Sequence, residues 1–206
     1  MPGLRIAYLG HAAPSVPQVM RTFGPDSRVT VLPLLLTAAY HSKTDIPRVL
    51  ARTGVRVRYG EPLGPHPLLL RALERRLPET ALQNPAETGV VLAAAGSSDP
   101  EANATLARLA ARWQAAAGWF AVRPAYASAT GPTPAQAVTE LRIAGARRVV
   151  VASYLLAPGL FADRIRDASL AAGADAVSSA LGAAPEIADV VLDRYTEAGT
   201  RERAAA

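Results

Sequence analysis

The sequence predicts an α/β protein built on parallel β-sheets. Short apolar runs alternate with amphipathic segments, these segments open with helix-capping signals, and several landmarks occur twice in the same order. Such alternation is typical of parallel sheets covered by helices. A length of 206 residues is compatible with one large domain or two lobes of about 100 residues each.

Largely apolar runs of five to nine residues, rich in Val, Leu and Ala, mark the expected strands. They lie at 4–9, 29–37, 55–59, 89–95, 120–127, 148–156 and 174–180.

The helices between these strands are expected from their capping signals. Ser15-Val-Pro-Gln18 and Thr133-Pro-Ala-Gln136 both read as capping boxes, in which the hydroxyl accepts from the third helical amide and the glutamine reaches back. Ser98-Asp-Pro-Glu101 is expected to form a third. The helix that follows it places apolar residues on one face, at Leu106, Leu109, Ala110, Trp113 and Ala117.

The two halves of the chain repeat one another. Pro14-Ser15 recurs as Pro132-Thr133, 118 residues later, and the run VLPLLL at 31–36 resembles VASYLL at 151–156, 120 residues later. Further pairs are Gly54 with Gly173 and Leu63-Gly64 with Leu181-Gly182. The repeat predicts two copies of one α/β unit, residues 1–80 and 88–206. The strand and helix expected at 89–118 have no partner in the first half, so the N-terminal lobe is expected to lack its first βα unit.

Composition excludes several classes of function. The chain has no cysteine, which excludes disulfides, thiolate nucleophiles and iron–sulfur clusters. No apolar run is long enough for a membrane span and no export signal opens the chain, so we expect a cytoplasmic protein without membrane contact. The net charge of +5 comes from scattered arginines and a single lysine, Lys43. We therefore expect no nucleic acid partner, although a positive field favours an anionic small ligand.

Three histidines follow the first three expected strands, at His11, His41 and His66. Ligands of open parallel sheets bind at the carboxyl ends of the strands. Imidazole is the commonest transition-metal ligand and a proton acceptor near neutral pH, so these residues are candidates for a site. Solvated or helix-capping loop histidines remain the alternative.

The segment AGSSDP at 95–100 follows a strand and opens a helix, where amides and hydroxyls can receive an anion. A well-capped helix without a ligand is the alternative. The chain has neither a Walker loop nor a GxGxxG fingerprint, so no nucleotide is expected, and the absence of GxSxG argues against a serine hydrolase.

Five segments together resemble the long form of the sirohydrochlorin cobalto- and ferrochelatases, the class II chelatases. They read VLPLLLTAAYHSKTDIP (31–47), LGPHPLLLRAL (63–73), VVLAAAGSSDP (90–100), SATGPTPAQAV (128–138) and VASYLLAPGLFADRI (151–165). The resemblance implies two flavodoxin-like lobes, each with strand order 2-1-3-4, and a cleft between them. It also implies insertion of Co²⁺ or Fe²⁺ into sirohydrochlorin without ATP, on the way to cobalamin or sirohaem.

The resemblance assigns His41 as a catalytic and metal-contacting residue. The family's other histidine belongs to an HGSRDP-like motif after the absent first strand, and the copy of that motif in the second lobe has Ala95 at the histidine position. A carboxylate common in the family corresponds to Gly10, so His11 beside it is the expected second metal contact. The counterpart of His41 in the second lobe is Phe161. We expect Gly96, Ser97 and Ser98 to help orient the carboxylates of the tetrapyrrole.

The leading hypothesis is therefore a sirohydrochlorin chelatase whose substrates are a divalent metal and a tetrapyrrole. Because one histidine motif is absent, we expect slower metallation than in a chain that has it. The alternative is a non-catalytic tetrapyrrole- or metal-binding protein that kept the fold and lost part of the site. A monomer or a weak homodimer is expected, since the fused form contains both lobes.

Overall fold

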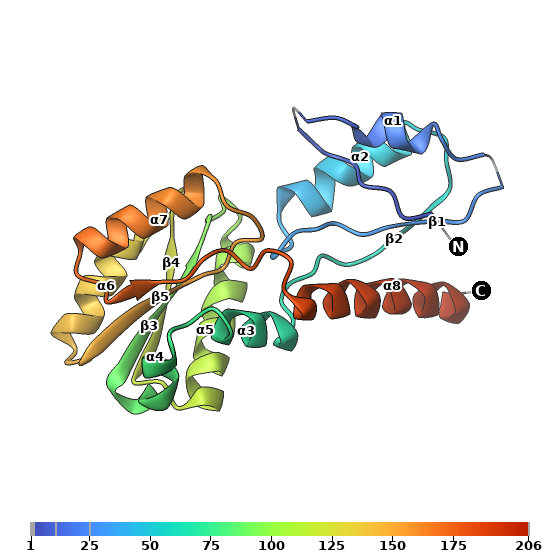
Figure 1. The fold of residues 1–206 in the computed structure, drawn as a ribbon. Coiled ribbons are helices and arrows are strands. Elements are labelled where there is room, and N and C mark those ends of the chain that lie inside the picture. The colour runs from blue at the N-terminus through green and yellow to red at the C-terminus, as the bar shows by residue number, and fades with distance from the viewer. Residues whose placement is uncertain (1–2, 11, 25, 206) are drawn as a thin grey trace. The chain divides into compact units, whose positions relative to one another are not determined.

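The structure is a computed structural model that describes residues 3–10, 12–24 and 26–205. The chain divides into two compact units, one formed by Met1–Leu63 with Val191–Ala206 and the other by Gly64–Val190. Both are α/β, as predicted (Figure 1). None of the described helices is long and apolar enough to cross a membrane.

The unit Gly64–Val190 contains a four-stranded parallel sheet in the order β4-β3-β5-β6. Its strands are β3 (Thr88–Ala94), β4 (Ala121–Tyr126), β5 (Arg148–Ser153) and β6 (Ala176–Val177). In chain order this is 2-1-3-4, the arrangement that the resemblance implies. Every residue of the central strand β3 is buried, because both of its edges are paired and helices cover both faces.

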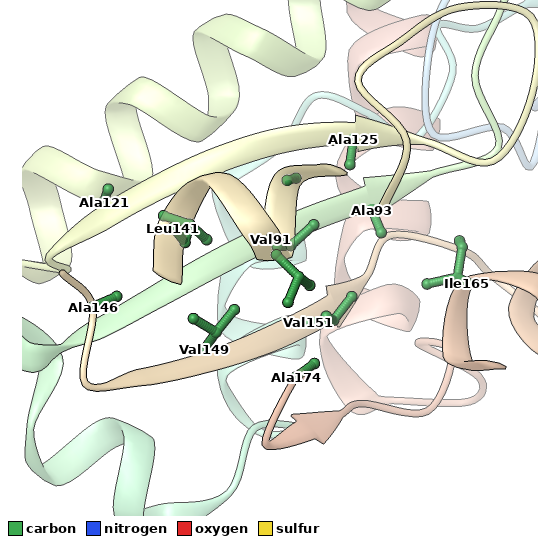
Figure 2. Close-up of a cluster of buried hydrophobic side chains, with 12 residues drawn as sticks. Val91, Ala93, Ala121, Ala125, Leu141, Ala146, Val149, Val151, Ile165 and Ala174 are labelled. Atoms are coloured by element: carbon green, nitrogen blue, oxygen red, sulfur yellow. The ribbon is translucent and has the colours of Figure 1, made fainter. Parts of the chain in front are cut away.

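Seven helices and helical turns belong wholly or partly to this unit. They are α3 (Pro67–Glu74), α4 (Glu79–Gln83), η2 (Pro85–Glu87), α5 (Pro100–Ala117), α6 (Pro134–Ile143), α7 (Leu160–Ala171) and the start of α8 (Pro185–Ala205). The core gathers Val91, Val151, Leu141 and Ile165 from two strands and two helices, and none of these side chains is exposed (Figure 2).

The unit built from Met1–Leu63 and Val191–Ala206 has a smaller sheet. Strands β1 (Val29–Val31) and β2 (Val57–Tyr59) pair in parallel, and α1 (Val16–Met20), η1 (His41–Asp45) and α2 (Ile46–Ala51) connect the remaining segments. Val16, Met20 and Leu50 form its buried core. The end of α8 packs beside Gly60, where an added Cβ would lie 3.5 Å from the Cβ of Ala198.

The strand expected at residues 4–9 is not formed. In the described residues this segment makes one bridge, between Tyr8 and Ser15, and leaves Leu4 and Ile6 84% and 59% exposed. Its counterpart β4 pairs with β3, and no described strand of the first unit corresponds to β3. A strand without that neighbour has no ladder to join.

The first two capping boxes are confirmed. The Ser15 amide donates to Gln18 Oε1 at 2.7 Å, and the Thr133 amide donates to Gln136 Oε1 at 2.8 Å. The third prediction was wrong, because Asp99 caps α5 by accepting from the Glu101 amide at 3.0 Å. Pro100 occupies the first helical position, which makes the residue before it the cap.

The repeat is visible in matching turns. The Tyr8 amide donates to the Pro14 carbonyl, and 118 residues later the Tyr126 amide donates to the Pro132 carbonyl, both at 2.9 Å. Both prolines follow cis peptide bonds. Local sequence therefore produces the same turn in both units.

The compact units do not coincide with the predicted lobes at 1–80 and 88–206. Helix α3 belongs to the unit Gly64–Val190, where Glu74 accepts from Trp113 Nε1 at 2.8 Å and Arg75 pairs with Glu186 at 2.6 Å. The end of α8 belongs to the other unit. Helices at the end of each repeat thus group with the compact unit that holds most of the other repeat. The division into an N-terminal lobe at 1–80 and a C-terminal lobe at 88–206 stays a prediction.

Candidate metal and substrate site

His41 opens a π-helical turn that follows the loop after β1. The turn, η1, covers His41–Asp45, and the Ile46 amide donates to the His41 carbonyl. Single π turns are rare and occur frequently at functional sites. The turn also carries Lys43, the chain's only lysine, which is exposed.

The His41 imidazole is accessible and lies against a carboxylate. Its Nδ1 lies 3.1 Å from Asp45 Oδ2, and the His41 side chain is 61% exposed. The Tyr40 ring meets the imidazole edge-on, with 5.8 Å between ring centroids. An imidazole held in this way can bind a metal or accept a proton.

The turn is anchored from β2 by Tyr59. The Tyr59 hydroxyl donates to the Ser42 carbonyl at 2.8 Å, and the Ser42 hydroxyl lies 3.1 Å from both the amide and the carbonyl of Ala39. Burial, with a smaller contribution from Glu61, raises the pKa of Tyr59 to about 12. Tyr59 therefore remains a hydrogen-bond donor throughout the physiological pH range.

Sequence reasoning missed both Asp45 and Tyr59. The spacing of four residues between His41 and Asp45 was a usable signal, because residues i and i+4 of a helix are neighbours. Tyr59 had no such signal, since its contact with Ser42 depends on how β2 and the turn are placed.

The other predicted metal contact, His11, lies outside the described residues. Within the part of the chain that the structure describes, no three His, Asp or Glu side chains gather into a group that could hold a metal ion. Of the two predicted metal contacts, the described part of the chain therefore includes only His41.

His66 has a structural role. It caps α3, and its Nδ1 accepts from the Leu68 amide at 3.3 Å. This is the helix-capping alternative that the sequence left open for the histidines.

The loop that contains Gly96, Ser97 and Ser98 follows β3 in the unit Gly64–Val190. Gly96 has φ +90°, and a Cβ there would lie 2.1 Å from the Ser128 carbonyl oxygen, so only glycine fits. The Ser97 amide donates to Asn103 Oδ1, and the Ser97 hydroxyl oxygen accepts from the Asp99 amide at 3.0 Å. Ser98 is exposed and Ser97 is partly buried.

The matching position in the second repeat holds an apolar residue. Phe161 lies in the first turn of α7 and is 39% exposed. The chemistry of the His41 turn is therefore not duplicated there.

Curated relatives of this chain are named as tetrapyrrole chelatases. The sirohydrochlorin cobaltochelatase of Priestia megaterium is 31% identical over 147 residues, which cover 68% of this chain and 48% of the relative. The sirohydrochlorin ferrochelatase of Bacillus subtilis is 29% identical over 181 residues, which cover 83% of this chain and 69% of the relative. The chain thus spans about half to two thirds of the length of such relatives.

Solved structures of related chelatases resemble this chain in fold. SirB from Bacillus subtilis with Fe³⁺ matches with a TM-score of 0.82 at 25% identity, over 97% of this chain and 83% of that one. The sirohydrochlorin chelatase SirB of Bacillus subtilis subspecies spizizenii, in complex with cobalt, matches with a TM-score of 0.76 at 25% identity, over 96% and 81%. The sequence model of the CbiX family matches residues 1–80 and 89–198. By sequence and by fold, this chain belongs to the CbiX family.

Proposed function

We propose that the chain inserts Co²⁺ or Fe²⁺ into sirohydrochlorin without ATP, in the synthesis of cobalamin or sirohaem. The observation that carries the proposal is the His41 imidazole, exposed on a π turn with a carboxylate at one ring nitrogen. The choice of sirohydrochlorin and of Co²⁺ or Fe²⁺ as substrates follows from membership of the CbiX family and from the names of the relatives.

The reaction explains why an imidazole is needed. A divalent metal replaces two pyrrole protons of the macrocycle, so each turnover consumes one metal ion and releases two protons. A neutral imidazole can hold the incoming metal or accept a departing proton and pass it to water. We assign His41 to this catalytic and metal-contacting role, with His11 as the assisting ligand.

The substrate's carboxylates give other residues a role. Sirohydrochlorin is a polycarboxylate, and a net charge of +5 favours its approach. The hydroxyl groups of Ser97 and Ser98, on the loop that Gly96 allows, are proposed to hydrogen-bond substrate carboxylates. Such contacts persist in the ground and transition states, so they affect binding more than rate.

A second candidate is a non-catalytic tetrapyrrole- or metal-binding protein of the same family. It is favoured by Ala95, which stands where the family resemblance calls for histidine, and by the finding that no three candidate metal ligands gather among the described residues. It differs from the first candidate in predicting binding without turnover.

Absorbance-monitored metal insertion tests the proposal. The purified chain, sirohydrochlorin and Co²⁺ are mixed, and the rate is corrected for spontaneous insertion. We expect a protein-dependent rate that His41→Ala lowers by roughly 10²–10⁴-fold, the usual cost of losing a general acid–base group. His66→Ala is the matched control and should retain the rate.

Binding of sirohydrochlorin without acceleration would favour the non-catalytic candidate. Equal losses from His41→Ala and His66→Ala would show that the assignment of His41 is wrong.

A further inference from the structure

Asp45 is the last residue of the π turn η1 and is followed directly by α2, so it lies inside a continuous helical stretch. Here its backbone is already helical, with φ −72° and ψ −55°, and the carboxylate makes no capping hydrogen bond. Its defined contact is with His41 Nδ1, at 3.1 Å.

This contact determines where the imidazole proton lies. An ionised carboxylate only accepts hydrogen bonds, so in a neutral imidazole the proton must be on Nδ1. The lone pair is then on Nε2. The side chains of His41 and Asp45 are 61% and 30% exposed, so the pair remains accessible to a ligand.

The repeat provides an internal comparison. At the offset of 120 residues, His41 corresponds to Phe161 and Asp45 to Ile165, which is completely buried. The second repeat therefore lacks the imidazole and the carboxylate together, and α7 begins without a π turn.

We infer that Asp45 is a positioning residue that holds His41 with its proton on Nδ1, so that Nε2 presents a lone pair to the metal or to a pyrrole proton. The inference rests on the proposed function of His41 for its purpose, but the tautomer itself is a property of the free protein. Carboxylates behind metal-binding histidines fix ring orientation and increase ligand basicity, and their loss typically costs about 10–100-fold in metal affinity or activity.

The tautomer can be measured directly by ¹⁵N NMR of the imidazole nitrogens in the full chain, above the ordinary imidazole pKa. Three histidines make assignment simple, because His41→Ala removes one set of signals. His66 is an internal reference for the opposite state, since its Nδ1 accepts a hydrogen bond and its proton must be on Nε2 when neutral. We expect His41 to show a protonated Nδ1 and His66 a protonated Nε2.

Asp45→Ala should shift His41 toward the Nε2-protonated form and weaken Co²⁺ binding by about 10–100-fold, measured by calorimetry with Co²⁺ alone. Asp45→Asn keeps an acceptor without the charge and should give intermediate values. Asp26→Ala is the matched control, because it removes an exposed carboxylate from the same unit and should change neither quantity. Circular dichroism of each variant checks that α2 is intact.

A His41 proton on Nε2 in the unmodified chain would overturn the inference. An unchanged Co²⁺ affinity in Asp45→Ala would overturn it too. A lower Co²⁺ affinity with unchanged ¹⁵N signals of His41 would also overturn it, because Asp45 would then be a direct metal ligand. Failure of the proposed function gives a different result, in which the tautomer and its dependence on Asp45 hold but no metal enters sirohydrochlorin.

Discussion

Tyr8 and Tyr126 form the same turn in very different surroundings. Each donates its amide to a proline carbonyl six residues later, and each turn leads into a capping box. Tyr8 is 46% exposed, whereas Tyr126 is 5% exposed and its hydroxyl donates to the Asn103 carbonyl at 3.0 Å. Local hydrogen bonds are thus specified by local sequence, while burial requires the central strand and the helix that follows it.

The strand pairs β1–β2 and β5–β6 show the same contrast. The residues of β1 are only partly buried, whereas most of β5 is fully buried because β3 pairs with its other edge. Regions with few buried apolar contacts open with a lower free energy. We therefore expect the unit that contains His41 to be the less stable one.

The largest expected effect comes from exchanging site residues between the repeats. His41→Phe copies the second repeat into the first and should reduce the rate of metal insertion by roughly 10²–10⁴-fold, because the imidazole is lost. Phe161→Ala, at the matching position, should leave the rate within about twofold of the original, since it adds and removes no group that binds metal or protons. Absorbance-monitored insertion measures both. A comparable loss from Phe161→Ala would mean that both repeats contribute to the chemistry.

The next largest effect is expected on stability, when one buried leucine is shortened in the hydrophobic core of each unit. Leu141→Ala should lower the free energy of unfolding by about 2–5 kcal/mol, and Leu50→Ala by a value near the lower end of that range, because Leu50 lies in the smaller cluster. Urea unfolding should be followed by tryptophan fluorescence, since both tryptophans, Trp113 and Trp119, lie in the unit Gly64–Val190. Circular dichroism reports both units. Leu50→Ala should shift only the unfolding transition followed by circular dichroism. An equal shift of the fluorescence transition would show that the two units do not unfold independently.

A smaller effect is expected at the tyrosine that anchors the His41 turn. Tyr59→Phe removes the donor to the Ser42 carbonyl and should lower the unfolding free energy by roughly 0.5–1.5 kcal/mol. The folded pKa of about 12 lies above the ordinary 10.0, so folding favours the neutral phenol. Its stabilising contribution is complete below pH 10 and is lost as the pH rises through 12. Circular dichroism against pH measures this loss, and exposed Tyr195→Phe is the control. An unchanged alkaline profile in Tyr59→Phe would be evidence against the anchor.

The smallest effect is expected in the exposed segment before the first turn. Leu4→Ala should change the unfolding free energy by less than about 0.5 kcal/mol, because Leu4 is 84% exposed. Val122→Ala, at the matching position in β4, should cost roughly 1–2 kcal/mol, because two buried carbon atoms are removed. Chemical denaturation measures both, and a large loss from Leu4→Ala would show that this segment is packed in solution.

The sequence predicted the parallel α/β class, the strand order of one sheet through the family resemblance, and two of three capping boxes. These features depend on short-range patterns. It overestimated the strand at 29–37, which ends at Val31, because Pro33 lacks an amide hydrogen for the ladder. The strand at 4–9 failed because apolar alternation does not indicate whether a neighbouring strand is present.

The site was predictable only in part. His41 was predicted because its position after a strand and its flanking segments are distinctive, and its role stays a prediction. Asp45 and Tyr59 depend on a π turn and on the parallel register that pairs Val31 with Tyr59, and neither could be deduced from residue periodicity. The roles of Gly96, Ser97 and Ser98 stay a prediction, although the structure explains why glycine is needed at the first of them.

The single lysine on the π turn makes the site chemically addressable. Reductive methylation with isotopically labelled formaldehyde modifies amines, so within the chain it would mark Lys43 and the amino terminus alone. Lys43 is exposed and lies two residues from His41. A paramagnetic Co²⁺ ion bound at His41 would shift and broaden the resonance of that dimethylated amine. Metal arrival at this turn could then be observed in solution without introducing any foreign residue.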